Sequence, residues 1–205
     1  MKPNRADADW ERMYAPCDPQ TYREALGYIR PNDVVLDIGA GDLRFARQAA
    51  TIARKVIAIE INSTLLARAA QSVPLPANLT PICADARAYD FPLGVTIGVL
   101  LMRHCLHFRL YAEKLRDIGA QQLVTNARWR MGAEVVNLRD KARLPYASLE
   151  LGAYACWCGA VGFKPGPVEH LTPTIADKVS EVIDCPQCFP KSGKPSQHEN
   201  VILQS

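Results

Sequence analysis

A run of apolar residues leads directly into two closely spaced glycines early in the chain. Val34 to Ile38 has the composition of a buried strand, the turn Gly39-Ala40-Gly41 follows at once, and a helix-like segment begins at Leu43. Glycines at such a junction let the backbone turn tightly and let a ligand approach the main chain closely. This order of strand, glycine turn and helix predicts an α/β sheet with a nucleotide-type site at the turn.

Acidic residues stand at the ends of three predicted strands. Asp37 lies in the first strand, Glu60 ends the second apolar run and Asp85 follows the third, at spacings of 23 and 25 residues. Because ligands of open α/β sheets bind outside the carboxyl ends of the strands, we expect the three acids to line one crevice. A carboxylate only accepts hydrogen bonds, so it suits the two donor hydroxyls of a ribose and repels a 2′-phosphate.

Strand-like and helix-like segments alternate along residues 19–126. The near-continuous apolar run from Val95 to Met102 is typical of a strand buried on both faces of a parallel sheet. Alternation of this kind predicts right-handed βαβ units and a doubly wound, mostly parallel sheet. The expected strands are 34–38, 56–59, 79–83, 95–102 and 122–126, the expected helices are 19–30, 43–52, 63–72 and 111–118, and shorter strands are expected at 134–138, 149–156 and 161–164.

The glycine turn and the three strand-end acids resemble motifs I, II and III of the class I S-adenosylmethionine (SAM) methyltransferases. The resemblance covers roughly residues 20–130 and implies a Rossmann-like fold whose sheet ends in an antiparallel C-terminal hairpin. It implies that the turn packs against the methionine portion of SAM, that Glu60 binds the ribose hydroxyls, and that Asp85 accepts a hydrogen bond from the adenine amino group. The cofactor-binding residues expected on this basis are Asp37, Gly39, Ala40, Gly41, Glu60, Ile61, Asn62, Asp85, Ala86 and Met102.

The methyl acceptor is predicted to meet SAM just beyond the fourth strand, near Arg103 and His104. Methyl transfer mainly requires that the acceptor be positioned and kept nucleophilic, because SAM already carries the activated group. His104 is the candidate general base, since the pKa of histidine lies near neutrality, and Arg103 is a candidate for binding an anionic group. His107 is an alternative base, and a place on a helix surface is the alternative for either histidine.

The first half of the chain is also similar to the rRNA adenine dimethylases, through the acid-containing glycine turn and the later run Ala58-Ile-Glu-Ile61. Enzymes that methylate the exocyclic amine of adenine carry Asn or Asp, two prolines and an aromatic residue after the fourth strand. This chain has Met102-Arg-His-Cys105 there, so the resemblance stops before the amine-binding motif. The segment from Asn126 to Arg130 mixes an amide, cations and an aromatic ring, which suits stacking on a base or simply ends a strand.

Positive charge is concentrated in one segment. Residues 100–145 contain nine Lys or Arg and four Asp or Glu, although the net charge of the whole chain is only +3. Such an excess suits an anionic substrate or nucleic acid, and solvated helix faces are the alternative explanation. RNA is therefore slightly favoured as the acceptor, with Arg128 and Arg130 as candidate contacts. A small-molecule methyltransferase and a catalytically inactive SAM- or RNA-binding protein are the alternatives.

Four cysteines near the C-terminus form two close-set pairs. Cys156 and Cys158 make a C-x-C turn, Cys185 and Cys188 make a C-x-x-C turn, and 26 residues lie between the pairs. Two such turns supply the four thiolates of a tetrahedral zinc site, which has no open position for substrate and is therefore structural. A redox-active C-x-x-C and unrelated free cysteines are the alternatives.

The length of 205 residues predicts one main domain with a small appended element. We divide the chain into a lead-in at 1–18, a SAM-binding domain at 19–148, and a hairpin with the zinc element at 149–205. No apolar run approaches the roughly 20 residues that span a bilayer, and the N-terminus lacks a signal-peptide core, so we expect a cytoplasmic protein without a membrane partner. A nucleotide-dependent oxidoreductase is disfavoured, because Arg44 replaces the third glycine of the dinucleotide fingerprint.

Overall fold

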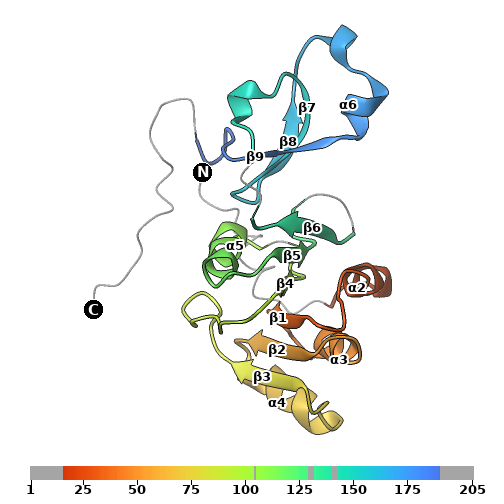
Figure 1. Cartoon of the computed structure of the whole chain (residues 1–205), viewed down its shortest axis with the longest axis vertical. Helices are drawn as coiled ribbons and strands as arrows, with labels where there is room; N and C mark the ends of the chain where they lie inside the picture. Colours follow the sequence, from red (N-terminus) through yellow and green to blue (C-terminus); the bar gives the residue numbers. More distant parts are fainter. Residues whose placement is uncertain (1–15, 104, 129–131, 140–142, 190–205) are drawn as a thin grey trace, which may run out of the picture. The chain divides into compact units, whose positions relative to one another are not determined.

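The computed structural model describes residues 16–103, 105–128, 132–139 and 143–189 (Figure 1). The chain divides into two compact units, one formed by residues 4–140 and the other mainly by residues 141–205. Residues 143–148, which the sequence assigns to the first domain, group with the second unit. Each unit has its own sheet and its own hydrophobic core. Within these described ranges, no helix is both long and apolar enough to cross a membrane.

The first unit is built on a six-stranded sheet with the order β3-β2-β1-β4-β5-β6. All neighbouring strands are parallel except β5 and β6, which pair antiparallel at one edge. The order reverses between β1 and β4, and this switch point is where an open α/β sheet binds its ligand. The strands are β1 (Val34–Ile38), β2 (Lys55–Glu60), β3 (Leu79–Cys83), β4 (Ile97–Leu100), β5 (Gln122–Thr125) and β6 (Glu134–Asn137).

Helices cover both faces of this sheet, as predicted for a doubly wound fold (Figure 1). One face packs its apolar side chains with those of α2 (Pro19–Leu26), α3 (Arg44–Ala50) and α4 (Ser63–Ser72) in a continuous core. The other face carries α5 (Phe108–Asp117), whose Leu115 side chain lies directly over Gly98 of β4. A Cβ at Gly98 would overlap Leu115, so the glycine allows this helix to approach the sheet closely.

The fourth strand is shorter than the apolar run predicts. The run extends from Val95 to Met102, but β4 pairs only from Ile97 to Leu100. Before it, the Thr96 hydroxyl donates a hydrogen bond to Asp33, and after it Leu101 and Met102 line a pocket. The apolar residues Leu101 and Met102 therefore form part of the pocket wall. Hydrophobicity alone does not distinguish such residues from those of a strand.

The second unit contains a three-stranded sheet with the order β8-β7-β9. The expected hairpin of 149–156 and 161–164 is present as β7 (Gly152–Cys156) and β8 (Val161–Lys164), which pair antiparallel. It belongs to this separate sheet, however, and does not extend the parallel one. β9 (Val179–Val182), which pairs parallel with β7, was not predicted from the sequence. The same holds for the short elements η1 (Tyr146–Ser148), η2 (Val168–His170) and α6 (Pro173–Asp177).

The core of the second unit is small and depends on cysteine. The cluster around the cysteines has the buried members Leu149, Tyr154, Cys156, Val182 and Cys185, and the other buried apolar residues described in this unit are Leu151, Ala153, Ala155 and Trp157. Around it, the Lys164 ammonium donates to the carbonyl oxygens of Tyr146 and Ala147, and the ring of Tyr146 meets that of Tyr154 edge-on. A core of this size supplies little hydrophobic stabilisation, and small units of this kind need a further cross-link.

Candidate functional site

A pocket of about 620 Å³ opens at the carboxyl ends of the parallel strands. It draws together residues that follow β1, β2, β3 and β4, as expected for a ligand site at the switch point. His104, the candidate base, lies outside the described residues. The predicted residues that line the pocket are Asp37, Gly39, Ala40, Glu60, Ile61, Asn62, Asp85, Ala86, Met102 and Arg103.

The glycine turn after β1 is fixed to the end of β2 by main-chain hydrogen bonds. The amides of Gly39 and Ala40 both donate to the Ile59 carbonyl oxygen at 2.9 Å. The amide of Gly41 donates to Oε2 of Glu60 at 2.8 Å, so Gly41 joins the site through its backbone. The other carboxylate oxygen of Glu60 accepts from the amide of Asn62 at 2.8 Å. Glu60 therefore orders the loops on both sides of the pocket floor.

Gly39 is required at this turn for two independent reasons. Its φ of 73° lies in the left-handed region, which side chains strain to adopt. A Cβ at this position would also stand 2.8 Å from Sδ of Met102, closer than packing allows. The glycine thus lets the end of β4 approach the turn, and the two segments together close one side of the pocket.

Asp37 is a buried carboxyl group at the floor of this pocket. Only 3% of its surface is exposed, and Oδ2 has no hydrogen-bond partner within the described part of the chain. Burial, with a further contribution from the negative charge of Glu60, raises the pKa of Asp37 to about 7. A buried acceptor in this state is suited to a cationic or N–H-bearing ligand, which would supply the missing partner.

Asp85 is held by an arginine that the sequence analysis did not single out. Arg87 Nε and Nη2 bind the two carboxylate oxygens of Asp85 at 2.9 and 2.7 Å, and these hydrogen bonds lower the pKa of Asp85. Lys114 of α5 donates to the carbonyl oxygens of Ala86, Arg87 and Tyr89. Asp85 is therefore a fixed anion on a loop that α5 holds in place. An acid followed two residues later by arginine was the available sequence signal.

The remaining wall of the pocket comes from residues that the sequence analysis did not assign to the cofactor site. Pro16, Cys17 and Tyr22 precede or begin α2, and Asn126 follows β5. Asn126 Nδ2 donates to Cys17 Sγ at 3.3 Å, although 109 residues separate the two in sequence. Cys17 lies in the segment predicted as a lead-in, because no local pattern indicates such a distant partner.

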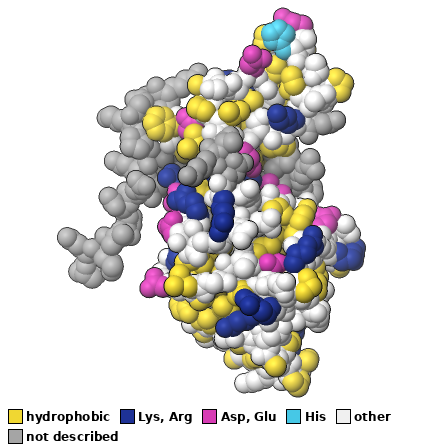
Figure 2. Space-filling model, viewed as in Figure 1, with side chains coloured by type: hydrophobic (Ala, Val, Ile, Leu, Met, Phe, Trp, Pro, Cys, Tyr) yellow, Lys and Arg dark blue, Asp and Glu magenta, His cyan; other side chains and the backbone are white. Residues whose placement is uncertain are grey.

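The structure corrects the proposed role of Arg128 in contacting RNA. Its side chain is buried, binds Glu134 at 3.0 Å and stacks over the ring of Phe108 at 4.9 Å. Trp129 and Arg130 lie outside the described residues. Other cations of the segment also have internal partners, including Arg109 with Glu113. On the face shown in Figure 2, Lys and Arg side chains stand in several separate groups.

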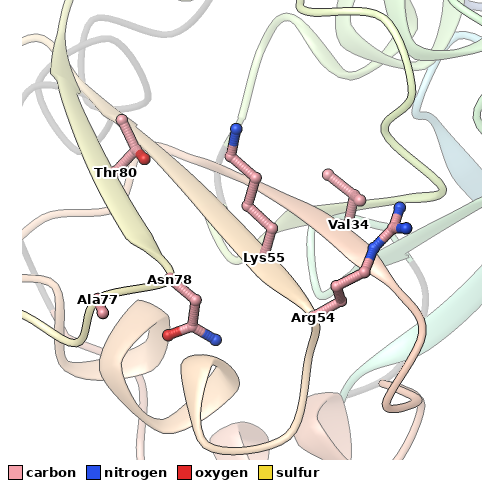
Figure 3. A pocket seen from close by; sticks show the side chains of 6 residues that line it. All are labelled: Val34, Arg54, Lys55, Ala77, Asn78 and Thr80. Carbon is pink, nitrogen blue, oxygen red and sulfur yellow. The ribbon is translucent and has the colours of Figure 1, made fainter.

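A second hollow of about 330 Å³ lies at the opposite end of the strands, near the starts of β2 and β3 (Figure 3). Arg54, Lys55 and Asn78 contribute to it. The Asn78 amide already donates to the carbonyl oxygens of Ala50 and Ala53, so it serves the local turn. None of the predicted site residues lines this hollow, and the candidate site is the larger pocket.

The four C-terminal cysteines form one cluster in the second unit. Cys156 ends β7, Cys158 lies in the following turn, and Cys185 and Cys188 follow β9. Their sulfur atoms all lie within 4.8 Å of one another, with separations of 3.7, 3.7 and 3.8 Å for three of the pairs. A tetrahedral zinc ion with Zn–S bonds of about 2.3 Å places its sulfur ligands about 3.8 Å apart. The donor set and its spacing therefore fit zinc.

Hydrogen bonds within the cluster shift the pKa values of its two buried thiols in opposite directions. Hydrogen bonds from the thiols of Cys156 and Cys158 lower the pKa of Cys185, whereas the pKa of Cys156 is raised by its hydrogen bonds with Cys158 and Cys185 and by burial. All four are free thiols, which excludes a disulfide between them in this structure.

Residues 35–121 match a family model described as a methyltransferase domain. Among solved structures, the chain is similar to the 23S rRNA methyltransferase ErmE, with 19% identity over 53% of this chain and 45% of that chain, and a TM-score of 0.48. It is also similar to a dimethyladenosine transferase from Plasmodium falciparum, with 20% identity over 55% and 42% of the two chains and a TM-score of 0.45. A SAM-dependent methyltransferase from Mesorhizobium loti gives 21% identity over 51% and 50%, with a TM-score of 0.42. The chain thus spans about half of these relatives or less, and no curated protein matches it.

The fold and the site define a doubly wound α/β domain with a nucleotide-type pocket at its switch point. Within this domain, residues 35–121 are the part of the chain that matches the methyltransferase-domain family.

Proposed function

We propose that this protein transfers a methyl group from SAM to a nucleophile bound in the pocket beside it. The observation that carries the proposal is that the Glu60 carboxylate, within a domain that matches the methyltransferase family, both orders the pocket loops and can still accept further hydrogen bonds. Its carboxylate is fixed by the amides of Gly41 and Asn62, and each oxygen keeps a lone pair for a further donor. A ribose with two adjacent hydroxyls matches this pair of acceptors.

The other predicted residues complete a site for SAM around Glu60. The carboxylate of Asp37 would attract the ammonium group of the methionine portion. Asp85 presents a fixed anion toward the adenine amino group, and Ile61, with 61% of its surface exposed, offers an apolar face to the ring. SAM supplies an activated methyl group, and the chain therefore has to bind, orient and exclude water from the two reactants.

The acceptor that the geometry supports best is a small molecule. Residues 141–205 of the second unit contain six Lys or Arg and six Asp or Glu, so their net charge does not favour a polyanion. The buried ion pair of Arg128 also removes one of the two cations proposed to contact RNA. RNA stays the second candidate, because residues 100–145 keep an excess of positive charge that does not depend on Arg128 alone.

The Cys₄ cluster is proposed to hold one structural zinc ion. Cys156, Cys158, Cys185 and Cys188 would occupy all four positions of a tetrahedron, so the ion would have no open site for substrate. Its contribution would be to fasten β7 to the segment that follows β9. A location in the cytoplasm, where these thiols stay reduced, agrees with this proposal.

Calorimetric titration with SAM and S-adenosylhomocysteine (SAH) tests the function. We expect micromolar affinity for both and no binding of NADH. Because the pKa of Asp37 is about 7, its carboxyl is mostly neutral at pH 6 and mostly ionised at pH 8. The affinity for the ammonium-bearing ligands should therefore rise about tenfold across this interval. Asp37→Asn should remove the pH dependence. NADH binding in place of SAM would refute the function, and a flat profile in the wild type would refute the role of Asp37.

Filter binding with total RNA at about 50 and 200 mM salt tests the second candidate. If RNA binds, its affinity should fall steeply with salt, because phosphate contacts release counterions. Arg103→Glu, at the exposed edge of the pocket, should then lower the slope by about one, whereas Arg68→Glu on α4 should leave it unchanged. If the RNA affinity does not change with salt, or if no RNA binds at low salt, the small molecule is the one remaining acceptor class.

A further inference from the structure

Asn126 lines the pocket and takes no part in the proposed contacts with SAM. It follows β5 directly, only 1% of its surface is exposed, and it lines the pocket together with Leu101 after β4. Thr125 fixes the turn, because its hydroxyl donates to the Leu100 carbonyl oxygen at 2.8 Å and accepts from the amide of Ala127 at 3.0 Å. The position of the Asn126 side chain is therefore set by the sheet itself.

The orientation of the Asn126 amide follows from its neighbour Cys17. The Cys17 thiol donates its single hydrogen to the Leu101 carbonyl oxygen at 3.5 Å. The Cys17 sulfur can then only accept a hydrogen bond from Asn126. The donor is the amide nitrogen Nδ2 of Asn126, which lies 3.3 Å from the sulfur. Burial raises the pKa of the Cys17 thiol, which keeps the hydrogen in place. Oδ1 of Asn126 is thereby turned away from the sulfur.

Oδ1 of Asn126 has no hydrogen-bond partner in the portion of the chain that the structure describes. The same holds for Oδ2 of Asp37, which lines the same pocket. Buried acceptors are nearly always satisfied in native proteins, so two such oxygens at one pocket indicate a ligand with hydrogen-bond donors. Glu60 and Asp85, by contrast, already accept hydrogen bonds from the chain.

We propose that the wall formed by Cys17 and Asn126 is the methyl-acceptor subsite, and that it binds a neutral nitrogen nucleophile through an N–H group donated to Asn126 Oδ1. The inference rests on the proposed function and names the substrate class of that site. Primary amines and amino groups of heterocycles belong to this class.

The chemistry of an amide oxygen selects nitrogen over oxygen and sulfur. An amide is a very weak base, so it does not deprotonate an alcohol, a phenol or a thiol before attack. An amine with two N–H groups donates one to Oδ1 and keeps its lone pair for the methyl carbon. The N–C bond forms as the C–S bond breaks, the sulfonium sulfur takes the electron pair to become a thioether, and the nitrogen then loses one proton to water.

The SAM analogue sinefungin, which carries a primary amine where SAM carries its methylsulfonium group, is a direct probe of this subsite. We expect the wild-type protein to bind sinefungin about tenfold more tightly than SAH, because the amine supplies a donor to Oδ1. Asn126→Ala should abolish this preference and leave the SAH affinity within about twofold. Asn126→Asp keeps an oxygen at the position and should retain the preference. If the wild type binds SAH but has equal affinity for sinefungin and SAH, the inference is overturned.

A second measurement needs no variant. Aniline, phenol and thiophenol share one ring and differ only in the nucleophilic atom, so they form a matched set of small acceptors. With SAM and the wild-type protein, mass spectrometry should find N-methylaniline above a heat-inactivated control, and no enzymatic methylation of the other two. Enzymatic transfer to phenol or thiophenol alone, or to none of the three while SAH binds, would overturn the nitrogen assignment. Absence of SAH binding would instead refute the proposed function itself.

Discussion

Replacing Cys185 by serine should release zinc and unfold the second unit, while the SAM pocket keeps its affinity. The cluster that joins the cysteines to the core of this unit has five buried residues, and two of them are Cys156 and Cys185. Structural zinc contributes on the order of 10 kcal/mol in isolated finger peptides, which exceeds what so small a core provides. Elemental analysis should give one zinc ion per wild-type chain, and limited proteolysis of Cys185→Ser should cut within residues 143–189.

The control for this experiment is Cys83→Ser. Cys83 is an exposed thiol at the end of β3 and lies apart from the cluster in the other unit, so its variant should retain zinc and protease resistance. The SAH affinity of both variants should stay within about twofold of the wild type, because every pocket residue lies between Pro16 and Asn126. Zinc-free wild-type protein, purified without chelator, would contradict the metal site. So would a Cys185→Ser variant that keeps its resistance to protease.

Much of the first unit was predictable because its apolar runs, helix caps and glycine turns indicate the same elements that the sheet requires. The strands at 34–38 and 79–83 and the helix Ser63–Ser72 have the predicted bounds. In α4 the boundary was readable because Asn62 and Ser63 start the helix, with Asn62 Oδ1 accepting from the Leu65 amide, and Pro74 follows its end. Parallel strands buried on both faces appear in the sequence as apolar runs. Glycines and acidic residues at the carboxyl ends of these runs show where the strands end.

The parts that were missed depend on contacts between distant segments. β9 reads Val179-Ser-Glu-Val182, which has little hydrophobic pattern, and it becomes a strand through its pairing with β7. Arg128 was read as a surface cation, yet Glu134 and Phe108 bury it. The hydrogen bond between Cys17 and Asn126 spans 109 residues, so neither residue carries a local sign of it. The cysteine spacing, in contrast, was enough to predict that the four sulfurs meet.

The second large effect is expected from Glu60→Ala, which should weaken SAH binding about 100-fold, corresponding to about 3 kcal/mol. The substitution removes the proposed acceptor for the ribose hydroxyls. It also leaves the amides of Gly41 and Asn62 without their carboxylate partner, so the loops on both sides of the pocket floor lose their anchor. Each buried donor left unpaired costs about 1–3 kcal/mol, and part of this cost falls on ligand binding. Calorimetry at pH 8 measures the change.

Two features of this experiment separate a role in binding from a general loss of structure. Asp42 belongs to the same turn, but its carboxylate binds Arg44 in a partly exposed ion pair and does not line the pocket, so Asp42→Ala should change the SAH affinity by less than about twofold. The negative charge of Glu60 also contributes to the raised pKa of Asp37. In Glu60→Ala the pH at which the remaining affinity increases should therefore fall below that of the wild type, because the carboxylate of Asp37 no longer faces a second anion. Equal SAH affinity for the wild type and Glu60→Ala would remove the central contact of the proposed site.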